Sequence, residues 1–281
     1  MKLVRYGRPG LERPGVVDAD GVIRSLAAVV PDIAGHTLLP RSIERLMEID
    51  TATLPPVDPG VRLGPCVGSV GKIVCIGLNY SDHAAESGME VPNEPVLFMK
   101  ATSAITGPFD DVVLPPDATK ADWEVELGVV IGAPAKRIDV STARAHIAGY
   151  CIVNDLSERA FQLDGTGQWV KGKSCDTFAP LGPWLVTADD VPDPQTLDLW
   201  LEIDGRRHQN GTTATMIFGV DDLVAYVSRF MTLHPGDVIS TGTPPGVGLG
   251  YDPPIWLQPG DVMRLGITGL GVQQQRVVMG S

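Results

Sequence analysis

The order of apolar and polar residues along the chain predicts a fold built mainly from β-strands. Apolar runs bounded by glycine, proline or acidic residues predict buried strands at residues 72–77, 96–99, 122–132 and 148–155. Residues 197–203 alternate apolar and polar side chains with period 2, as in a strand with one covered face. We therefore expect a β-rich chain.

The first part of the chain has a character of its own. Apolar pairs flank Ala19-Asp20-Gly21, and the Asp-Gly step is a strong turn signal that predicts a hairpin. Residues 41–49 are expected to form a short helix, and residues 51–64 are rich in proline, as in a linker. We predict a small N-terminal α/β domain with its linker at residues 1–65 and a main domain at residues 66–281.

Two helical segments are expected in the main domain. Residues 219–231 carry apolar side chains at the spacing of one helix face and give the clearest amphipathic pattern in the chain. Residues 136–148 are expected to be a polar loop and a helix that starts with Ser141 as its N-cap. With these few helices, the fold class expected is α+β with a majority of strands.

Composition and charge exclude several classes of partner. The 281 residues are 43% hydrophobic and 20% charged, which is ordinary for a folded globular protein. A net charge of −12 disfavours nucleic acids and anionic membranes, because both need a basic face. The chain has no apolar run of membrane-spanning length, and its start lacks the hydrophobic segment of a signal peptide, so we expect a cytoplasmic location. The four cysteines are far apart and are expected to be reduced.

Three acidic residues are candidates for a metal site. Glu124 and Glu126 are two positions apart in a predicted strand, so their side chains point to the same face. Two neighbouring carboxylates repel unless a cation neutralises them, and a hard divalent ion with oxygen ligands does so well. A solvent-facing polar edge is the alternative. Asp155 follows another apolar strand, at the point where a rigid element can present a functional side chain.

Other polar residues stand at positions suited to a site. His83 and Glu86 are expected at i and i+3 on a short helix, where the carboxylate can orient the imidazole, although a surface pair has the same spacing. Lys100 ends a strand and either meets an anion or marks the exit of the strand into water. Arg159 and Gln162 share a helix face and suit a carboxylate or keto oxygen.

Six stretches, taken in their order and spacing, resemble the fumarylacetoacetate hydrolase family over roughly residues 70–275. They are Gly77-Leu78-Asn79-Tyr80-x-x-His83-x-x-Glu86, residues 94–100, residues 123–132, Asn154-Asp155, Lys171-x-Lys173-Ser174 and residues 236–244. The resemblance implies a β-rich mixed fold, with strands in a sandwich or barrel-like core, a small N-terminal domain and a homodimer.

The resemblance also implies roles for individual residues. It makes Glu124, Glu126 and Asp155 the ligands of Mg²⁺ or Mn²⁺. It makes His83 the catalytic base and Glu86 its orienting partner, with Lys173 as a third catalytic residue. The substrate-binding residues that it implies are Arg159, Gln162, Thr243, Tyr80 and Lys100.

The activity implied is the hydrolysis of a carbon–carbon bond in a small anionic 2-oxo acid. Residues 169–178 and 242–248 resemble bacterial hydrolases of 2,4-dioxo-3-deoxy-L-fuconate or L-rhamnonate, which give pyruvate and L-lactate. The alternatives are an acylpyruvate hydrolase or oxaloacetate decarboxylase, a 2-oxo-alkenoate hydratase or isomerase, and a ureidoglycolate lyase. Family resemblance does not choose among them, because function depends on the site rather than on the fold.

Overall fold

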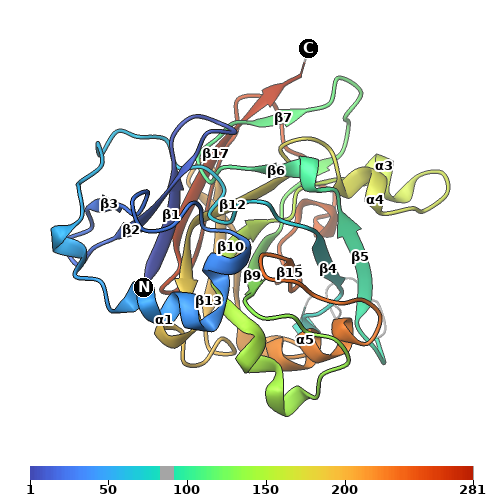
Figure 1. Cartoon of the computed structure of the whole chain (residues 1–281). Coiled ribbons are helices and arrows are strands. Elements are labelled where there is room, and N and C mark those ends of the chain that lie inside the picture. Colours follow the sequence, from blue (N-terminus) through green and yellow to red (C-terminus); the bar gives the residue numbers. More distant parts are fainter. Residues whose placement is uncertain (83–91, 281) are drawn as a thin grey trace.

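The computed structural model describes residues 1–82 and 92–280, and a ten-stranded sheet forms the centre of the molecule (Figure 1). Nine of its strands follow the order β3-β2-β1-β12-β10-β9-β15-β4-β5, and β6 pairs with β12. The strands are β1 (Lys2–Tyr6), β2 (Arg13–Val17), β3 (Ile23–Ser25), β4 (Ile73–Gly77), β5 (Val96–Lys100), β6 (Ile105–Thr106), β9 (Val125–Ile131), β10 (Ile147–Asn154), β12 (Ala179–Thr187) and β15 (Val238–Ser240).

A second sheet of five strands has the order β14-β13-β16-β17-β7, and a two-stranded sheet pairs β11 with β8. The strands are β7 (Val112–Leu114), β8 (Ala121–Asp122), β11 (Ser157–Glu158), β13 (Asp198–Ile203), β14 (Arg206–Thr212), β16 (Val262–Ile267) and β17 (Gly271–Met279). Within the described residues the large sheet ends at β3 and β5, so it is open and does not form a closed barrel. The predicted β-rich α+β fold is otherwise confirmed.

The helices of the described residues are short. They are α1 (Pro40–Met47), α3 (Arg159–Leu163), α4 (Val170–Lys173) and α5 (Val220–Ser228). Single turns of 3-10 helix occur at Gly35–Leu38, Thr51–Thr53, Thr102–Ala104, Ala188–Asp190, Thr213–Thr215 and Gly248–Gly250, and a longer one at Val140–His146. Both helices predicted at residues 41–49 and 219–231 are present as α1 and α5. No helix among the described residues is long and apolar enough to cross a membrane.

Two local predictions are confirmed only in part. Residues 122–132 form two strands, because side chains take the backbone N–H groups at the break: Asn154 Oδ1 accepts from Glu124 N at 3.3 Å, and Gln209 Oε1 accepts from Val125 N at 2.9 Å. The helix expected from Ser141 is the 3-10 helix Val140–His146, and the next residue already pairs with β9 as the first residue of β10. Ladder pairing there prevails over the local helix signal.

The N-terminal strands extend the large sheet. The hairpin of β2 and β3 is present as predicted, with Val17 opposite Ile23. β1 pairs with β12, so the blue strands at the left of Figure 1 continue the sheet that holds the central strands. The division at residue 65 stays a prediction.

The strand β9 lies between two apolar cores. Val125, Leu127 and Val129 pack in a core shared with the second sheet and α5, whereas Val130 packs in a core that includes β1, β2 and α1. Since side chains alternate along a strand, the even-numbered side of β9 carries both Val130 and Glu126. Near the start of β9, this side carries the carboxylate of Glu126 instead of an apolar side chain.

Candidate active site

Four strand ends meet at one edge of the large sheet and build the site. β10 runs antiparallel to β9, so the end of β10 lies beside the start of β9, where Asp155 N–H donates to the Glu124 carbonyl oxygen at 2.9 Å. β15 runs antiparallel to β9 and parallel to β4, so both of these strands end at the same edge. Strand pairing therefore unites residues that are distant in the sequence.

The carboxylates of Glu124, Glu126 and Asp155 converge at this edge. Each offers an oxygen, and the three oxygens lie within 4.8 Å of one another. The residues are 7%, 1% and 0% exposed, so the alternative of a solvent-facing polar edge is wrong. The convergence agrees with a shared cation, and the role of these residues as metal ligands stays a prediction.

Two buried lysines bind two members of the acidic triad, the name used below for Glu124, Glu126 and Asp155. Lys173 Nζ donates to Glu124 Oε2 at 2.6 Å and to Asp155 Oδ2 at 2.9 Å. Lys100 Nζ donates to Asp155 Oδ1 at 2.6 Å, so Lys100 meets an anion and does not mark an exit into water. Burial by itself lowers the pKa of Lys173, but Asp155 and Glu124 outweigh it and raise that pKa above its ordinary value. The Lys173 amine is therefore a cation at neutral pH.

Arg159, the first residue of α3, joins the triad to a further acid. Its Nε donates to Asp122 Oδ2 at 2.8 Å, and Nη2 donates to Glu124 Oε1 at 2.6 Å. Nη1 donates to Gln162 Oε1 at 2.9 Å, which is the i, i+3 contact that the spacing predicts. Because its oxygen is taken by Arg159, the amide of Gln162 has its N–H groups left for other acceptors.

Glu126 has a different set of partners from the other two acids. Its Oε2 accepts from the Ser240 hydroxyl at 2.6 Å and from Gly242 N–H at 2.9 Å. Within residues 1–82 and 92–280, no lysine, arginine or histidine forms an ion pair with it. Burial, together with Asp155 and Glu124, raises the pKa of Glu126 well above its ordinary value.

The donor set fits a hard divalent cation. Three oxygen ligands from rigid strand ends match the few carboxylates by which Mg²⁺ is usually held. A bound cation would also offset the unpaired negative charge of Glu126, which Lys173 and Lys100 do not contact directly. The residues present therefore suit Mg²⁺ or Mn²⁺.

A cavity of about 370 Å³ opens beside the triad. Six of the predicted site residues line it: Glu124, Glu126, Arg159, Gln162, Lys173 and Thr243. Asp155, Lys100 and Tyr80 are not among its lining residues, and each is at most 2% exposed. The substrate-binding roles of Lys100 and Tyr80 thus stay predictions.

The other predicted residues differ in what the structure shows. The Tyr80 hydroxyl is buried, and no hydrogen-bond partner is present for it in the described part of the chain. Thr243 Oγ1 donates to the Val125 carbonyl oxygen at 2.9 Å and accepts from Gln209 Nε2 at 2.8 Å, so this residue is fixed beside the start of β9. His83 and Glu86 lie outside the described residues.

Asp122 is a residue of the site that sequence reasoning missed. It is 0% exposed and accepts hydrogen bonds from Gly248 N–H at 2.6 Å and Leu249 N–H at 3.1 Å, in addition to Arg159. The loop after β15 thus presents two N–H groups to an anion, and that anion is a carboxylate of the chain itself. In the sequence, the only sign of this role was an acidic residue at the start of an otherwise apolar stretch. Its role as an acceptor for Arg159 and the loop is seen only in its hydrogen bonds.

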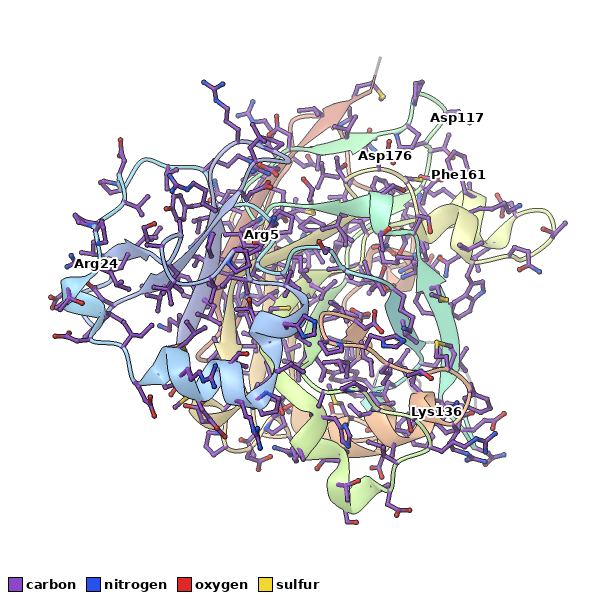
Figure 2. The ribbon with its side chains drawn as sticks, viewed as in Figure 1. Arg5, Arg24, Asp117, Lys136, Phe161 and Asp176 are labelled. Atoms are coloured by element: carbon purple, nitrogen blue, oxygen red, sulfur yellow. The ribbon has the colours of Figure 1, made fainter. Side chains whose placement is uncertain are left out.

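The side of the molecule that carries the site is far from the N-terminal strands. Figure 2 labels Phe161 in α3 at the right of the view, and Arg5 and Arg24 on β1 and β3 toward the left. The cavity is lined from α3, α4, the end of β4, the middle of β5, the start of β9 and the loop after β15. The N-terminal strands contribute no lining residue among those described.

Comparison with known proteins agrees with this arrangement. A family model described as fumarylacetoacetate hydrolase, C-terminal, matches residues 72–278. A relative from Burkholderia multivorans, named only as a candidate hydrolase, is 61% identical over 276 residues, which are 98% of each chain.

Two solved structures resemble the whole chain and carry names of different activities. The maleylpyruvate hydrolase of Sphingobium sp. SYK-6, solved in complex with manganese(II) ion and pyruvate, has a TM-score of 0.83 and 30% identity over 100% of both chains. The 5-carboxymethyl-2-hydroxymuconate delta-isomerase of Mycobacterium smegmatis has a TM-score of 0.79 and 34% identity over 100% of both chains. Because the family model spans most of its length, the chain belongs to the fumarylacetoacetate hydrolase family of hydrolases and isomerases.

Proposed function

We propose that this protein is a divalent-metal-dependent hydrolase that cleaves a carbon–carbon bond in a 2,4-dioxo acid. The observation that carries the proposal is the buried acidic triad, of which Glu124 and Glu126 line a cavity together with Lys173 and Arg159. The related maleylpyruvate hydrolase, solved with manganese(II) ion and pyruvate, supports the same class of ligand for this site.

The metal would be held by Glu124, Glu126 and Asp155, as Mg²⁺ or Mn²⁺. When bound, it supplies a fixed positive charge that stabilises negative charge developing on the oxygens of a 2-oxo acid. The remaining chemistry belongs to the side chains of the chain.

The cations of the cavity would bind and polarise the substrate. Lys173, protonated and buried, stabilises enolate charge on the pyruvate part of the substrate. Gln162 offers its amide N–H groups, oriented by the bond from Arg159 to its oxygen, to the substrate carboxylate. Thr243 borders the same space.

The hydrolytic step needs a base, and the family resemblance assigns this role to His83 with Glu86. His83 removes a proton from water, and the water oxygen attacks the C4 carbonyl. The C3–C4 bond then breaks, its electron pair forms the enolate of pyruvate, and a proton returns to C3. The products are pyruvate and the carboxylic acid that contains C4.

Other members of the same class keep parts of this scheme. An isomerase or decarboxylase uses the stabilised enolate without attack by water, and the isomerase named above makes isomerisation the second candidate. Hydrolysis of 2,4-dioxo-3-deoxy-L-fuconate or L-rhamnonate to pyruvate and L-lactate is the substrate choice that the sequence resemblance favours. A homodimer, a cytoplasmic location and a small anionic 2-oxo acid as substrate complete the proposal.

A product assay tests the proposal. The protein is incubated with acetylpyruvate, oxaloacetate, a 2-oxo-alkenoate and 2,4-dioxo-3-deoxy-L-fuconate, with Mg²⁺ or Mn²⁺ and with excess chelator. We expect pyruvate and one equivalent of carboxylic acid from a 2,4-dioxo acid, only with metal. Turnover that persists in excess chelator would refute the metal role, and rearranged product without pyruvate would identify an isomerase. Light scattering tests the dimer.

A His83→Ala variant separates hydrolysis from decarboxylation. Removing the base should abolish pyruvate formation from a 2,4-dioxo acid, because no group is left to activate water. Loss of CO₂ from oxaloacetate needs no hydrolytic water and should survive better. Equal loss of both activities would contradict the role given to His83.

A further inference from the structure

The described side chains that line the cavity include two groups of different chemistry. Glu124, Glu126, Arg159, Gln162 and Lys173 form the inner group and are at most 7% exposed. The second group, here named the acyl wall, is apolar and consists of Leu78, Phe98, Leu163, Trp169 and Leu249. Leu163 and Leu249 are 45% and 40% exposed, so the acyl wall reaches from the inner end to the rim of the cavity.

The acyl wall begins directly beside the amine of Lys173. The centroid of the Phe98 ring lies 5.1 Å from Lys173 Nζ and 5.2 Å from the centroid of the Trp169 ring, and the two rings meet edge to face. Trp169 in turn packs on the end of β4, where Gly77 leaves room for it: a Cβ at Gly77 would lie 2.8 Å from the indole ring. The wall is thus a packed surface continuous with the site.

Leu78, one residue of the acyl wall, has a strained backbone. Its backbone has φ = +55°, in the left-handed region that leucine adopts with strain and that glycine adopts freely. The leucine side chain at this turn lines the cavity and is only partly buried. Backbone strain of this kind concentrates at functional sites, where it holds a side chain in place.

The side chains of the acyl wall offer almost no hydrogen-bonding groups. Among the five side chains of the acyl wall, the indole N–H of Trp169 is the one polar group. A group bound there exchanges water for hydrocarbon. Hydroxyl groups placed there lose their hydrogen bonds to water and find few partners, which costs binding free energy.

We propose that the substituent on C4 of the substrate is a hydrocarbon chain held by the acyl wall, and not a polyhydroxylated chain. This inference rests on the proposed function, because the dioxo acid head must lie at the triad for the C4 substituent to extend along the wall. It narrows the substrate class to acylpyruvates with an apolar acyl group. It also reverses the preference for a deoxy sugar acid that the sequence resemblance gives.

A series of substrates with one head group tests this. We would measure kcat/KM for acetylpyruvate, butanoylpyruvate, hexanoylpyruvate and 2,4-dioxo-3-deoxy-L-fuconate with saturating Mn²⁺. Each fully buried CH₂ contributes about a fourfold gain. With about half of the chain covered, as the exposed rim implies, the four added carbons of hexanoylpyruvate should raise kcat/KM roughly 15-fold over acetylpyruvate. The sugar acid should fall at least about 10-fold below hexanoylpyruvate.

A pair of variants tests whether the preference for a longer alkyl chain depends on the acyl wall. Leu163→Ser places a polar group on the acyl wall, and we expect the ratio of hexanoylpyruvate to acetylpyruvate kcat/KM to fall about threefold or more. Val140→Ser is the matched control, since Val140 is 48% exposed and does not line the cavity. It should leave the ratio unchanged.

The outcomes separate the two proposals. If no 2,4-dioxo acid yields pyruvate with Mg²⁺ or Mn²⁺, the proposed function itself fails. If pyruvate forms but kcat/KM is flat along the alkyl series, or highest for the sugar acid, the proposed function stands and the hydrocarbon subsite is refuted. A ratio that Leu163→Ser and Val140→Ser change equally would also refute it.

Discussion

Replacing the buried carboxylate of Asp122 by an amide should destabilise the protein. Asp122 lies outside the acidic triad, is 0% exposed, and accepts from Arg159 Nε at 2.8 Å, Gly248 N–H at 2.6 Å and Leu249 N–H at 3.1 Å. The Asp122→Asn variant keeps the shape of the side chain but has one oxygen instead of two. The new NH₂ group then faces the N–H groups of Arg159 and Leu249, where donors meet donors.

The size of the effect follows from these contacts. One charge-assisted hydrogen bond to Arg159 is lost, which is worth about 1.5–3 kcal/mol, and the Leu249 N–H loses its partner at a cost of about 1–3 kcal/mol. Arg159 keeps its bond to Glu124 at 2.6 Å, so the guanidinium does not become an uncompensated buried charge. The free energy of unfolding should therefore fall by about 3 kcal/mol.

Urea unfolding, followed by the midpoint and the slope, measures this change. Asp164→Asn is the matched control, because Asp164 is a 63% exposed acid in an ion pair with Lys120, and its loss should cost less than about 0.5 kcal/mol. A free energy of unfolding for Asp122→Asn within about 0.5 kcal/mol of the wild type would refute the assignment of Asp122 as the anchor of Arg159 and the loop.

Three further predictions follow from single contacts. Glu126→Gln removes the acid of the triad that lacks an ion pair among the described residues. The affinity for Mn²⁺, measured by calorimetry, should fall about 100-fold, while the midpoint of urea unfolding should stay the same. An unchanged affinity would contradict the proposed ligand role. Lys100→Met removes one of the two buried cations that bind Asp155, whereas the bond from Lys173 remains. The free energy of unfolding should fall by about 1.5–3 kcal/mol in a urea titration, and an unchanged value would contradict the role of this pair. Burial raises the pKa of Asp110, but the ion pair with Arg62 outweighs it and holds that pKa below its ordinary value. The ion pair therefore stabilises the fold above the unfolded-state pKa of about 3.9, and this effect is lost as pH falls through the lower folded-state pKa. The difference in stability between the wild type and Arg62→Gln, measured by thermal melts at several pH values, should shrink between about pH 5 and pH 2. A constant difference would contradict the pairing.

Local periodicity was enough for several elements of the site. Glu124 and Glu126 are two positions apart, so any strand at this place puts both on one side, and the structure buries both. Arg159 and Gln162 are three positions apart and meet on one helical turn for the same reason. The helices α1 and α5 could also be predicted from the sequence, because each carries its own apolar face.

Local signals failed where distant side chains compete for the backbone. The break between β8 and β9 depends on acceptors from Asn154 and Gln209, and neither is near residues 123–125 in the sequence. The helix expected from Ser141 is a 3-10 helix that ends at His146, because Ile147 already pairs with β9. In both places the free energy of a tertiary hydrogen bond exceeds the weak preference of a single residue.

By itself the sequence determined which side chains can share a face and which residues resemble a known family. Only the tertiary structure decided how they meet. Asp155 reaches Glu124 because β10 is antiparallel to β9, and Lys100 reaches Asp155 across 55 residues of sequence. The acyl wall likewise joins β5, α3 and the loop after β15, and no local pattern holds this information. Spacing along a chain fixes direction within one element, whereas contacts between elements depend on strand order, register and the burial that these impose.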